Sequence, residues 1–502
     1  MSPTQNLTHD TTTPRSGDHP PRSDPPAPGR RTPIEVAAEI GLLALWAVSG
    51  FLFELAFVEV VLLGALLLAA FQTLVRRRPL RTLLVRDTAS FARHWWGKLL
   101  VAAVLVALPA AMVVTSLGGS RYGRYADDSW KALLMLAVLA AAYLASRRLI
   151  ISVLVGAATV ALVSWALTPK LADTRNGDAT VLTDIHGHAD RCVLAGHHDI
   201  AVAEVDLDSA QPVLLAGIGA DDMTPMEVGS MTKAMTGLVM ADSVSRGEIR
   251  MDAPVATYLP QLGGSPAGAV TMQELVTHTS GYAEFGGVTL RRAVWAAPVG
   301  RSFLTADSTQ MIEEARDQTL GSGGRYAYSS LGAAIAGQAV AAAAHLSYPE
   351  LMRTRLFEPL GMSHTAIQVD HPLVPGGTSQ TGLPVEPWVM DAYAPTGGAV
   401  STTGDLARLA TALLNGTAPG LTALDPTTAT DQSNTRIGTF WHTSVWQTGQ
   451  TITHHAGQTG GYASYLGLDR QARKAVIVLS DVANDAGDLG SQLLADRKEG
   501  TS

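Results

Sequence analysis

The sequence lacks the features of a disulfide-bonded scaffold and of a nucleic-acid-binding surface. Its single cysteine, Cys192, excludes an intrachain disulfide, so the redox compartment cannot be inferred from thiols. A net charge of −8 leaves no excess of basic side chains to neutralise phosphates, which argues against a nucleic-acid partner. Lysine is scarce as well, because only six of the 36 basic residues are lysines. A lysine beside a potential nucleophile is therefore conspicuous.

The first third of the chain holds most of the apolar excess and differs in composition from the rest. Residues 1–33 are rich in Pro, Ser, Thr and Arg and have almost no large apolar side chains, so we expect a disordered tail. This tail also lacks the apolar core of a secretory signal. Residues 34–168 are mostly apolar: the run 34–75 is about twice the roughly 20 residues that one span needs, and three further runs follow near 97–117, 130–146 and 149–167. About five transmembrane helices are therefore expected there.

Arginine clusters predict how this all-α transmembrane bundle is oriented. The pairs or runs at 30–31, 76–78 and 147–148 are expected in the cytoplasm, because loops on that side carry an excess of Lys and Arg. With five spans, everything after residue 169 then lies outside. The sequence therefore predicts a multi-pass plasma-membrane protein whose C-terminal domain is extracytoplasmic.

The C-terminal part reads as one domain of the α+β class. Residues 169–180 are predicted to form a polar linker, and residues 181–495 the domain itself. Alternating or continuous apolar runs predict strands near 200–205, 212–215, 451–455, 461–468 and 474–479, with helical patterns between them. The clearest of these helices is expected to start after residues 401–403 and to stop at residues 415–416. We therefore expect an antiparallel sheet that is completed by both ends of the domain, flanked by helices and carrying a helical subdomain.

Ser230 and Lys233 are the first candidates for chemistry. They begin a run with helical character, and a spacing of three residues places both side chains on one face of the first turn. The positive end of the helix dipole favours a serine alkoxide and lowers the pKa of a nearby lysine. A lysine in this position can act as a neutral base, which an arginine cannot.

Two later segments supply further candidates. Tyr328 is placed to share proton transfer with Lys233, and Ser330 follows two residues later. His455, Gly457 and Gln458 lie where a predicted strand runs into a Gly-rich turn. Glycine there lets a substrate approach the backbone closely, and a free N–H at such a turn can complete an oxyanion hole.

In this order, Ser230-x-x-Lys233, Tyr328-x-Ser330 and His455-Ala-Gly457 resemble the three signatures of the penicillin-recognising serine hydrolases. The group that contains class C β-lactamases, esterases and D-aminopeptidases is the most similar, and the resemblance covers residues 180 to 490. It implies a β-lactamase/transpeptidase-like fold and an acyl-enzyme on Ser230, with protons handled by Lys233 and Tyr328. It further implies an oxyanion hole from the N–H groups of Ser230 and Gln458, and a substrate contact from His455.

One position departs from this family pattern. Ser330 stands where the motif usually ends in Asn, and it lacks the amide that contacts the lysine and the substrate. The departure puts efficient β-lactam hydrolysis in doubt more than acyl-enzyme formation. The alternative function is therefore a catalytically weak membrane sensor or binder of β-lactams or cell-wall fragments.

A metal hydrolase is a second alternative. Asp184, His186, His188 and Asp190 form a ligand-rich stretch, and a second one runs from residue 197 to 199. We expect the first stretch to be helical, where side chains two residues apart diverge. No metal and no cofactor are therefore predicted.

The expected substrate is a small molecule or cell-wall peptide: a D-alanyl peptide, an amide, an ester or a β-lactam. Within this range, the sequence leads to one sharper hypothesis. A protonated His455 would bind a substrate carboxylate, so activity on acidic substrates would decline above pH ~7.

Overall fold

This computed structural model describes residues 169–188, 196–297, 300–321, 323–380 and 382–496. The predicted disordered tail (1–33) and the predicted transmembrane bundle (34–168) lie outside the described residues. Within the described residues, no single helix is long and apolar enough to cross a membrane. One pair of helices bent by 77°, Ser330–Ala343 and Tyr348–Phe357, meets that criterion by length and composition only.

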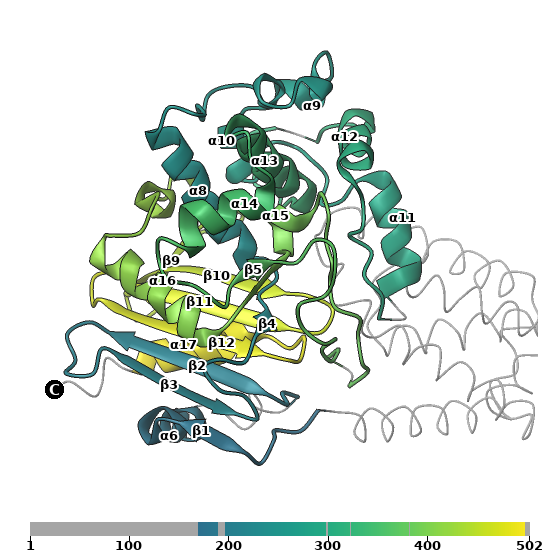
Figure 1. The fold of residues 1–502 in the computed structure, drawn as a ribbon. Coiled ribbons are helices and arrows are strands. Elements are labelled where there is room, and N and C mark those ends of the chain that lie inside the picture. Colours follow the sequence, from purple (N-terminus) through teal and green to yellow (C-terminus); the bar gives the residue numbers. More distant parts are fainter. Residues whose placement is uncertain (1–168, 189–195, 298–299, 322, 381, 497–502) are drawn as a thin grey trace, which may run out of the picture.

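In the described part of the chain, nine strands form one antiparallel sheet in the order β1-β3-β2-β12-β11-β10-β9-β8-β7 (Figure 1). Their bounds are β1 Arg175–Gly177, β2 Ile200–Asp206, β3 Val213–Ile218, β7 Thr428–Ala429, β8 Thr435–Ile437, β9 His442–Val445, β10 Thr451–Gln458, β11 Ala463–Asp469 and β12 Lys474–Ser480. A smaller sheet has the order β4-β6-β5, with β4 Met226–Glu227, β5 Ala366–Ile367 and β6 Ala399–Ser401.

The centre of the large sheet joins the two ends of the domain, as the sequence predicted. Strand β2 pairs with β12 so that Ile200 lies opposite Ser480 and Asp206 opposite Lys474. Nearly every residue of these two strands is buried, on both faces. This explains why their residues are mostly apolar, with the buried Glu204 of β2 as an exception, because a strand covered by helices on both sides has no solvent-facing positions.

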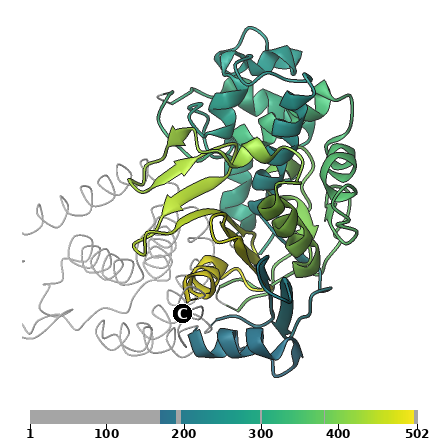
Figure 2. The same ribbon diagram turned by 90° about the vertical axis from the view of Figure 1, so that its left-hand side faces the viewer.

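Helices cover both faces of the sheet (Figures 1 and 2). On one face lie α6 (Ala179–His188) and α17 (Ala486–Asp496), and on the other lie α8 (Met231–Ser245) and α16 (Thr403–Asn415). The helical subdomain consists of α9 Pro266–Ala269, α10 Met272–Val276, α11 Gly287–Ala296, α12 Ser308–Asp317, α13 Ser330–Ala343, α14 Tyr348–Met352 and α15 Ala394–Gly397, with a π-helix at Arg353–Phe357 and 3-10 turns at Val255–Thr257, Pro260–Leu262 and Leu421–Leu424.

Helix α8 runs between the sheet and the subdomain and is buried on all sides over most of its length. Trp441 Nε1 donates to the carbonyl of Ala234 at 3.0 Å. Gly237 lets the loop before β9 approach closely, since a Cβ there would lie 2.1 Å from the Thr439 carbonyl oxygen. The helix that carries Ser230 is therefore fixed by side chains and by backbone contacts.

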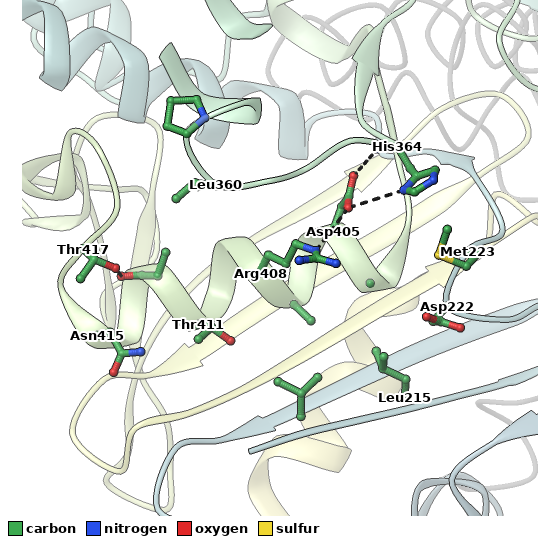
Figure 3. A pocket seen from close by; sticks show the side chains of 15 residues that line it. Leu215, Asp222, Met223, Leu360, His364, Asp405, Arg408, Thr411, Asn415 and Thr417 are labelled. Carbon is green, nitrogen blue, oxygen red and sulfur yellow. Dashed lines mark hydrogen bonds and ion pairs between the residues drawn. The ribbon is translucent and has the colours of Figure 1, made fainter. Parts of the chain in front are cut away.

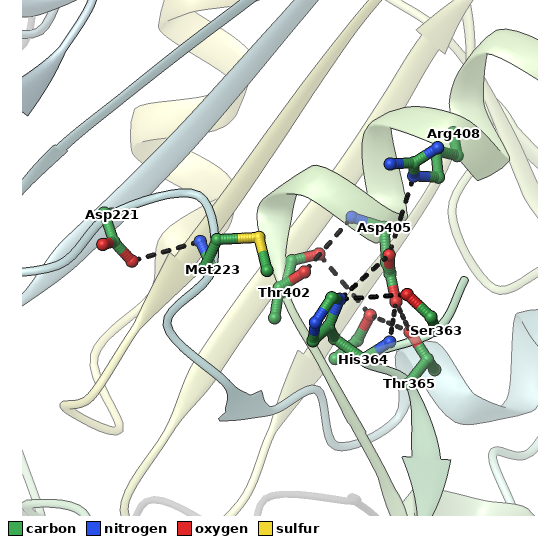
Figure 4. Close-up of polar contacts among 9 residues, drawn as sticks. Asp221, Met223, Ser363, His364, Thr365, Thr402, Asp405 and Arg408 are labelled. Carbon is green, nitrogen blue, oxygen red and sulfur yellow. Dashed lines mark hydrogen bonds and ion pairs between the residues drawn. The ribbon is translucent and has the colours of Figure 1, made fainter. Parts of the chain in front are cut away.

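Helix α16 has the start and end that the sequence predicted. Thr402 caps its N-terminus, and Gly416 ends it in the left-handed conformation with φ 73°. Within the first turn, the buried Asp405 accepts hydrogen bonds from His364 N at 2.7 Å and Thr365 Oγ1 at 2.8 Å (Figure 4). These bonds tie α16 to the segment that enters β5.

The structure corrects the prediction of a linker at residues 169–180. Strand β1 lies inside this range and pairs with β3, with Arg175 opposite Ile218, and α6 begins at Ala179. All three residues of β1 are exposed, so the strand has no apolar pattern to reveal it. Its place in the sheet comes from backbone pairing, which composition does not encode.

The close approach at Gly237 predicts that Gly237→Ala lowers the free energy of unfolding by about 1–3 kcal/mol, because the added Cβ forces α8 and the Thr439 backbone apart. Gly187→Ala in α6 is the matched control, since nothing lies within 4 Å of its added Cβ. For Gly187→Ala we expect the free energy of unfolding not to fall, and to rise by at most about 1 kcal/mol because alanine has the higher helix propensity. Chemical denaturation of both variants provides the comparison, and equal effects would contradict the tight contact.

Candidate active site

Ser230 is the N-cap residue of α8, and Lys233 lies in the first turn of that helix. Lys233 Nζ lies 3.0 Å from Ser230 Oγ and donates a hydrogen bond to the carbonyl oxygen of Thr396 at 2.7 Å. Thr396 belongs to α15, so a backbone carbonyl of another helix anchors the amine. The two predicted residues therefore meet with the geometry that a nucleophile and its base need.

The environment of Lys233 favours the neutral amine. The side chain is fully buried, and this burial lowers its pKa from 10.5 to about 7, although the nearby carboxylate of Glu284 acts in the opposite direction. A pKa near neutrality suits a general base, because a large part of the population can then accept a proton.

Tyr328 also reaches the hydroxyl of Ser230. Its phenolic OH donates to Ser230 Oγ at 2.9 Å, and Lys233 Nζ lies 4.9 Å from the centroid of its ring. Burial, which is the largest effect, raises the pKa of Tyr328 well above its usual value of 10. The phenol therefore keeps its proton, which suits a donor or proton relay more than a base.

The backbones beside Ser230 and along β10 approach each other closely. Gly229 has φ 49°, and a Cβ there would lie 2.7 Å from Gln458 N. A Cβ on Gly457 would lie 2.0 Å from the Val228 carbonyl oxygen. Both positions thus require glycine for space, and Gly229 requires it for its conformation as well. The predicted oxyanion-hole residues Ser230 and Gln458 are side by side as a result.

A pocket of about 610 Å³ opens onto Ser230. Tyr326 and Tyr328 line it, and β9 and β10 contribute His442, His454 and His455. Its remaining described lining residues are Gln380, Thr430, Asp431, Gln432, Thr435, Ala456, Gly457, Gln458, Ala463, Asn484, Asp485 and Ala486. The structure therefore brings the candidates from the three sequence motifs to one site.

A sequence model of the family described as Beta-lactamase matches residues 190–499, which is more than half of the chain. The chain belongs to the Beta-lactamase family.

Individual relatives in this family are distant. A beta-lactamase of Escherichia coli K12 is 29% identical over 207 residues, which cover 40% of this chain and 49% of that protein. Penicillin-binding protein 4 of Amycolatopsis lactamdurans is 28% identical over 278 residues, or 50% of this chain and 70% of that protein. The chain thus spans about half the length of the first of these relatives.

The fold is also shared with solved structures. A class C beta lactamase from Rhodobacter sphaeroides superposes with a TM-score of 0.51 at 19% identity, over 64% of this chain and 98% of the other. This likeness confirms the predicted α+β, β-lactamase/transpeptidase-like fold of the C-terminal domain.

Ser330 is where this Beta-lactamase family member departs from the usual motif. It is the first residue of α13 and is buried. Among the described residues, the hydrogen bonds of Lys233 Nζ go to Ser230 and Thr396, and none goes to Ser330. The Thr396 carbonyl therefore holds the lysine here. Sequence analysis missed Thr396, because a backbone carbonyl leaves no signature in the sequence.

The structure corrects the predicted charge of His455. Its side chain is buried, Nδ1 lies 2.6 Å from the Ala456 carbonyl oxygen, and Nε2 has no hydrogen-bond partner among the described residues. Burial lowers its pKa well below 6.5, and repulsion from Lys233 adds to this effect. His455 is therefore neutral at pH 7 and does not supply the cation that the hypothesis of carboxylate binding required.

His278 is a second residue whose position the sequence did not reveal. It has φ 55°, which is rare outside glycine, and its ring lies 4.5 Å from the ring of Tyr328. Its Nδ1 accepts a hydrogen bond from Ser329 N at 3.1 Å. His278 thus supports Tyr328 by a ring contact and by a bond to the next residue. Its Thr-His-Thr-Ser-Gly motif was visible in the sequence, but nothing there indicated this contact.

The ligand-rich stretches of the metal alternative separate in the structure. Asp184 and His186 lie on α6 as predicted, and Asp190 lies outside the described residues. His198 Nδ1 instead lies 3.0 Å from Asp199 Oδ1 and 3.1 Å from Asp481 Oδ2. Among the described residues, these three are the group of His, Cys, Asp or Glu side chains whose ligand atoms lie close enough together to hold a metal ion. The absence of a metal requirement stays a prediction.

A second groove, of about 620 Å³, lies along α16 beside β3 (Figure 3). Leu215, Met223 and Leu360 line it together with Asp405 and Arg408. The carboxylate of Asp405 already accepts the hydrogen bonds that hold the β5 segment. The described residues of this groove contain no serine or cysteine, so the groove offers no counterpart to Ser230.

The lowered pKa of Lys233 predicts that kcat/KM for a neutral ester rises with pH through about 7, because only the amine that has lost its proton can accept one from Ser230. Lys233→Arg removes the neutral form and should lower kcat/KM by about 10²–10⁴-fold. Lys474→Arg, on β12 beside Asp206, is the matched control. A flat profile from pH ~5.5 to ~9, or an active Lys233→Arg variant, would contradict the assignment.

Proposed function

We propose that the protein is a membrane-anchored, extracytoplasmic serine hydrolase that works through an acyl-enzyme on Ser230. One observation carries this proposal. Ser230 Oγ lies within hydrogen-bond distance of Lys233 Nζ at 3.0 Å and of Tyr328 OH at 2.9 Å, and Ser230 lines a pocket. The proposed substrates are D-alanyl peptides, amides, esters or β-lactams.

In the acylation step, Ser230 Oγ attacks the carbonyl carbon of the substrate while its proton passes to Lys233 Nζ. The carbonyl oxygen takes the negative charge and is stabilised by the N–H groups of Ser230 and Gln458. As the intermediate collapses, Tyr328 gives its proton to the leaving group, and the ammonium of Lys233 restores that proton. The products are the acyl-enzyme and an alcohol or amine.

Deacylation uses the same groups with water as the nucleophile. Water gives one proton to Lys233 as it attacks the acyl carbon. The ammonium of Lys233 returns this proton to Ser230 Oγ as the bond between Oγ and the acyl carbon breaks, which releases the carboxylic acid and restores the enzyme. Ser330 provides no amide to assist this step, which favours slow deacylation of bulky acyl groups. If deacylation is slow enough, the acyl-enzyme accumulates and the protein acts as the catalytically weak sensor or binder of the alternative function.

Intact-mass spectrometry of the full-length protein in detergent tests the nucleophile. A fluorophosphonate should add one equivalent to the wild type and none to Ser230→Ala. A penicillin adduct that persists would support a penicillin-binding peptidase or sensor, whereas fluorophosphonate labelling alone would support an esterase or amidase. If the folded protein is labelled by neither reagent, the serine-hydrolase proposal is wrong.

The membrane part of the proposal is supported by the apolar residues 34–168 and by the position of their arginine clusters. Cell fractionation should find the full-length protein in the membrane pellet after a high-salt wash. A protease added to intact spheroplasts should remove the domain after residue 169. Release into the soluble fraction would contradict the anchor, and full protection in intact spheroplasts would contradict the orientation.

A further inference from the structure

The charged side chains that line the active-site pocket are acidic. Among its described lining residues, Asp431 and Asp485 carry charge, and no lysine or arginine is present. Both carboxylates are exposed. A substrate that enters the pocket thus passes two negative groups, and a pocket lined by one sign of charge favours ligands of the other sign.

The three histidines that line the pocket are more buried than the two aspartates and are uncharged. His442 Nε2 lies 3.1 Å from Tyr326 OH, and His454 Nε2 lies 2.9 Å from Ser444 Oγ. The ring of His442 lies 5.5 Å from that of His455, so the three imidazoles form one contiguous surface. Burial lowers the pKa of His442 and of His454 to about 4, and that of His455 falls well below 6.5. At neutral pH none of them offers a cation.

The reaction centre itself adds little positive charge. The amine of Lys233 is already bonded to Ser230 and Thr396, and its pKa of about 7 leaves it partly neutral. The carboxylate of Glu284 acts electrostatically on both Lys233 and Tyr328. A substrate carboxylate would therefore lose its hydration without gaining an ionic partner, which is costly.

We propose that this pocket selects esters and amides whose substituent is uncharged or cationic, and that it discriminates against substrates that carry a carboxylate. This inference rests on Ser230 being the nucleophile of the proposed function, and it narrows the substrate class of that same site. Within the proposed range it disfavours β-lactams and peptides that end in D-alanine, because both carry a carboxylate beside the scissile bond.

The test uses the full-length protein in detergent and three p-nitrophenyl esters of similar length: butyrate, hemisuccinate and trimethylammoniobutyrate. The release of p-nitrophenolate reports acylation even when deacylation is slow. We expect kcat/KM for the neutral and cationic esters to exceed that for the anionic ester by about tenfold or more at low ionic strength. Added salt should reduce the part of this ratio that comes from the exposed carboxylates.

Asp431→Lys reverses one charge of the pocket, and because the position is exposed, the variant should fold. We expect the ratio of anionic to neutral turnover to rise about threefold to tenfold. Asp208→Lys, in the exposed turn after β2, makes the same change of charge outside the pocket and should leave the ratio unchanged.

Equal turnover of the three esters, or preference for the anionic one, would overturn the inference while leaving the proposed function intact. So would an Asp431→Lys variant whose ratio matches that of Asp208→Lys. If no ester reacts and a fluorophosphonate fails to label Ser230, the proposed function fails, and the inference fails with it. Fluorophosphonate labelling thus separates an error about the nucleophile from an error about the substrate.

Discussion

The burial of the Lys233 amine is the constraint on which the rest of the site depends. Taking this side chain from water lowers its pKa from 10.5 to about 7, which costs the folded protein on the order of 5 kcal/mol at low pH. The folded state binds fewer protons than the unfolded state between these two values, so the free energy of unfolding rises with pH across this window. The amine stays buried despite this cost, because helix α8 is packed into the core and the Thr396 carbonyl accepts a hydrogen bond from the amine.

The sheet supplies the second half of the site, and its topology explains how. Strands β2 and β12, which come from the two ends of the domain, pair within the sheet, and β10 follows two strands further on, beside the start of α8. Gly229 and Gly457 then allow the backbone of the turn before Ser230 and the backbone of β10 to touch. Gln458 is held from the other side, because its Nε2 donates to the Ala483 carbonyl oxygen at 2.5 Å. A rigid sheet is thereby joined to the helix that carries Ser230.

The sequence was most informative where a pattern is local. The apolar runs of β2 and β12, the cap and Gly416 of α16, and the spacing of Ser230 and Lys233 each depend on neighbouring residues, and the structure shows them as predicted. It was least informative where position depends on tertiary contact. The Thr396 carbonyl, the ring of His278 against Tyr328 and the exposed strand β1 have no local signal. The predicted positive charge of His455 was wrong for the same reason, since burial, which depends on tertiary contacts, lowers its pKa.

A direct titration of the lysine side chains by NMR, with lysine labelled with ¹³C at Cε, tests the central assignment. The chain has six lysines, and Lys233→Arg identifies the signal of interest. We expect that signal to titrate with a pKa of about 7, well below the ~10.4 of a lysine in a model peptide. If that signal titrates near ~10.4, Lys233 is an ordinary ammonium at neutral pH and is not the base that activates Ser230.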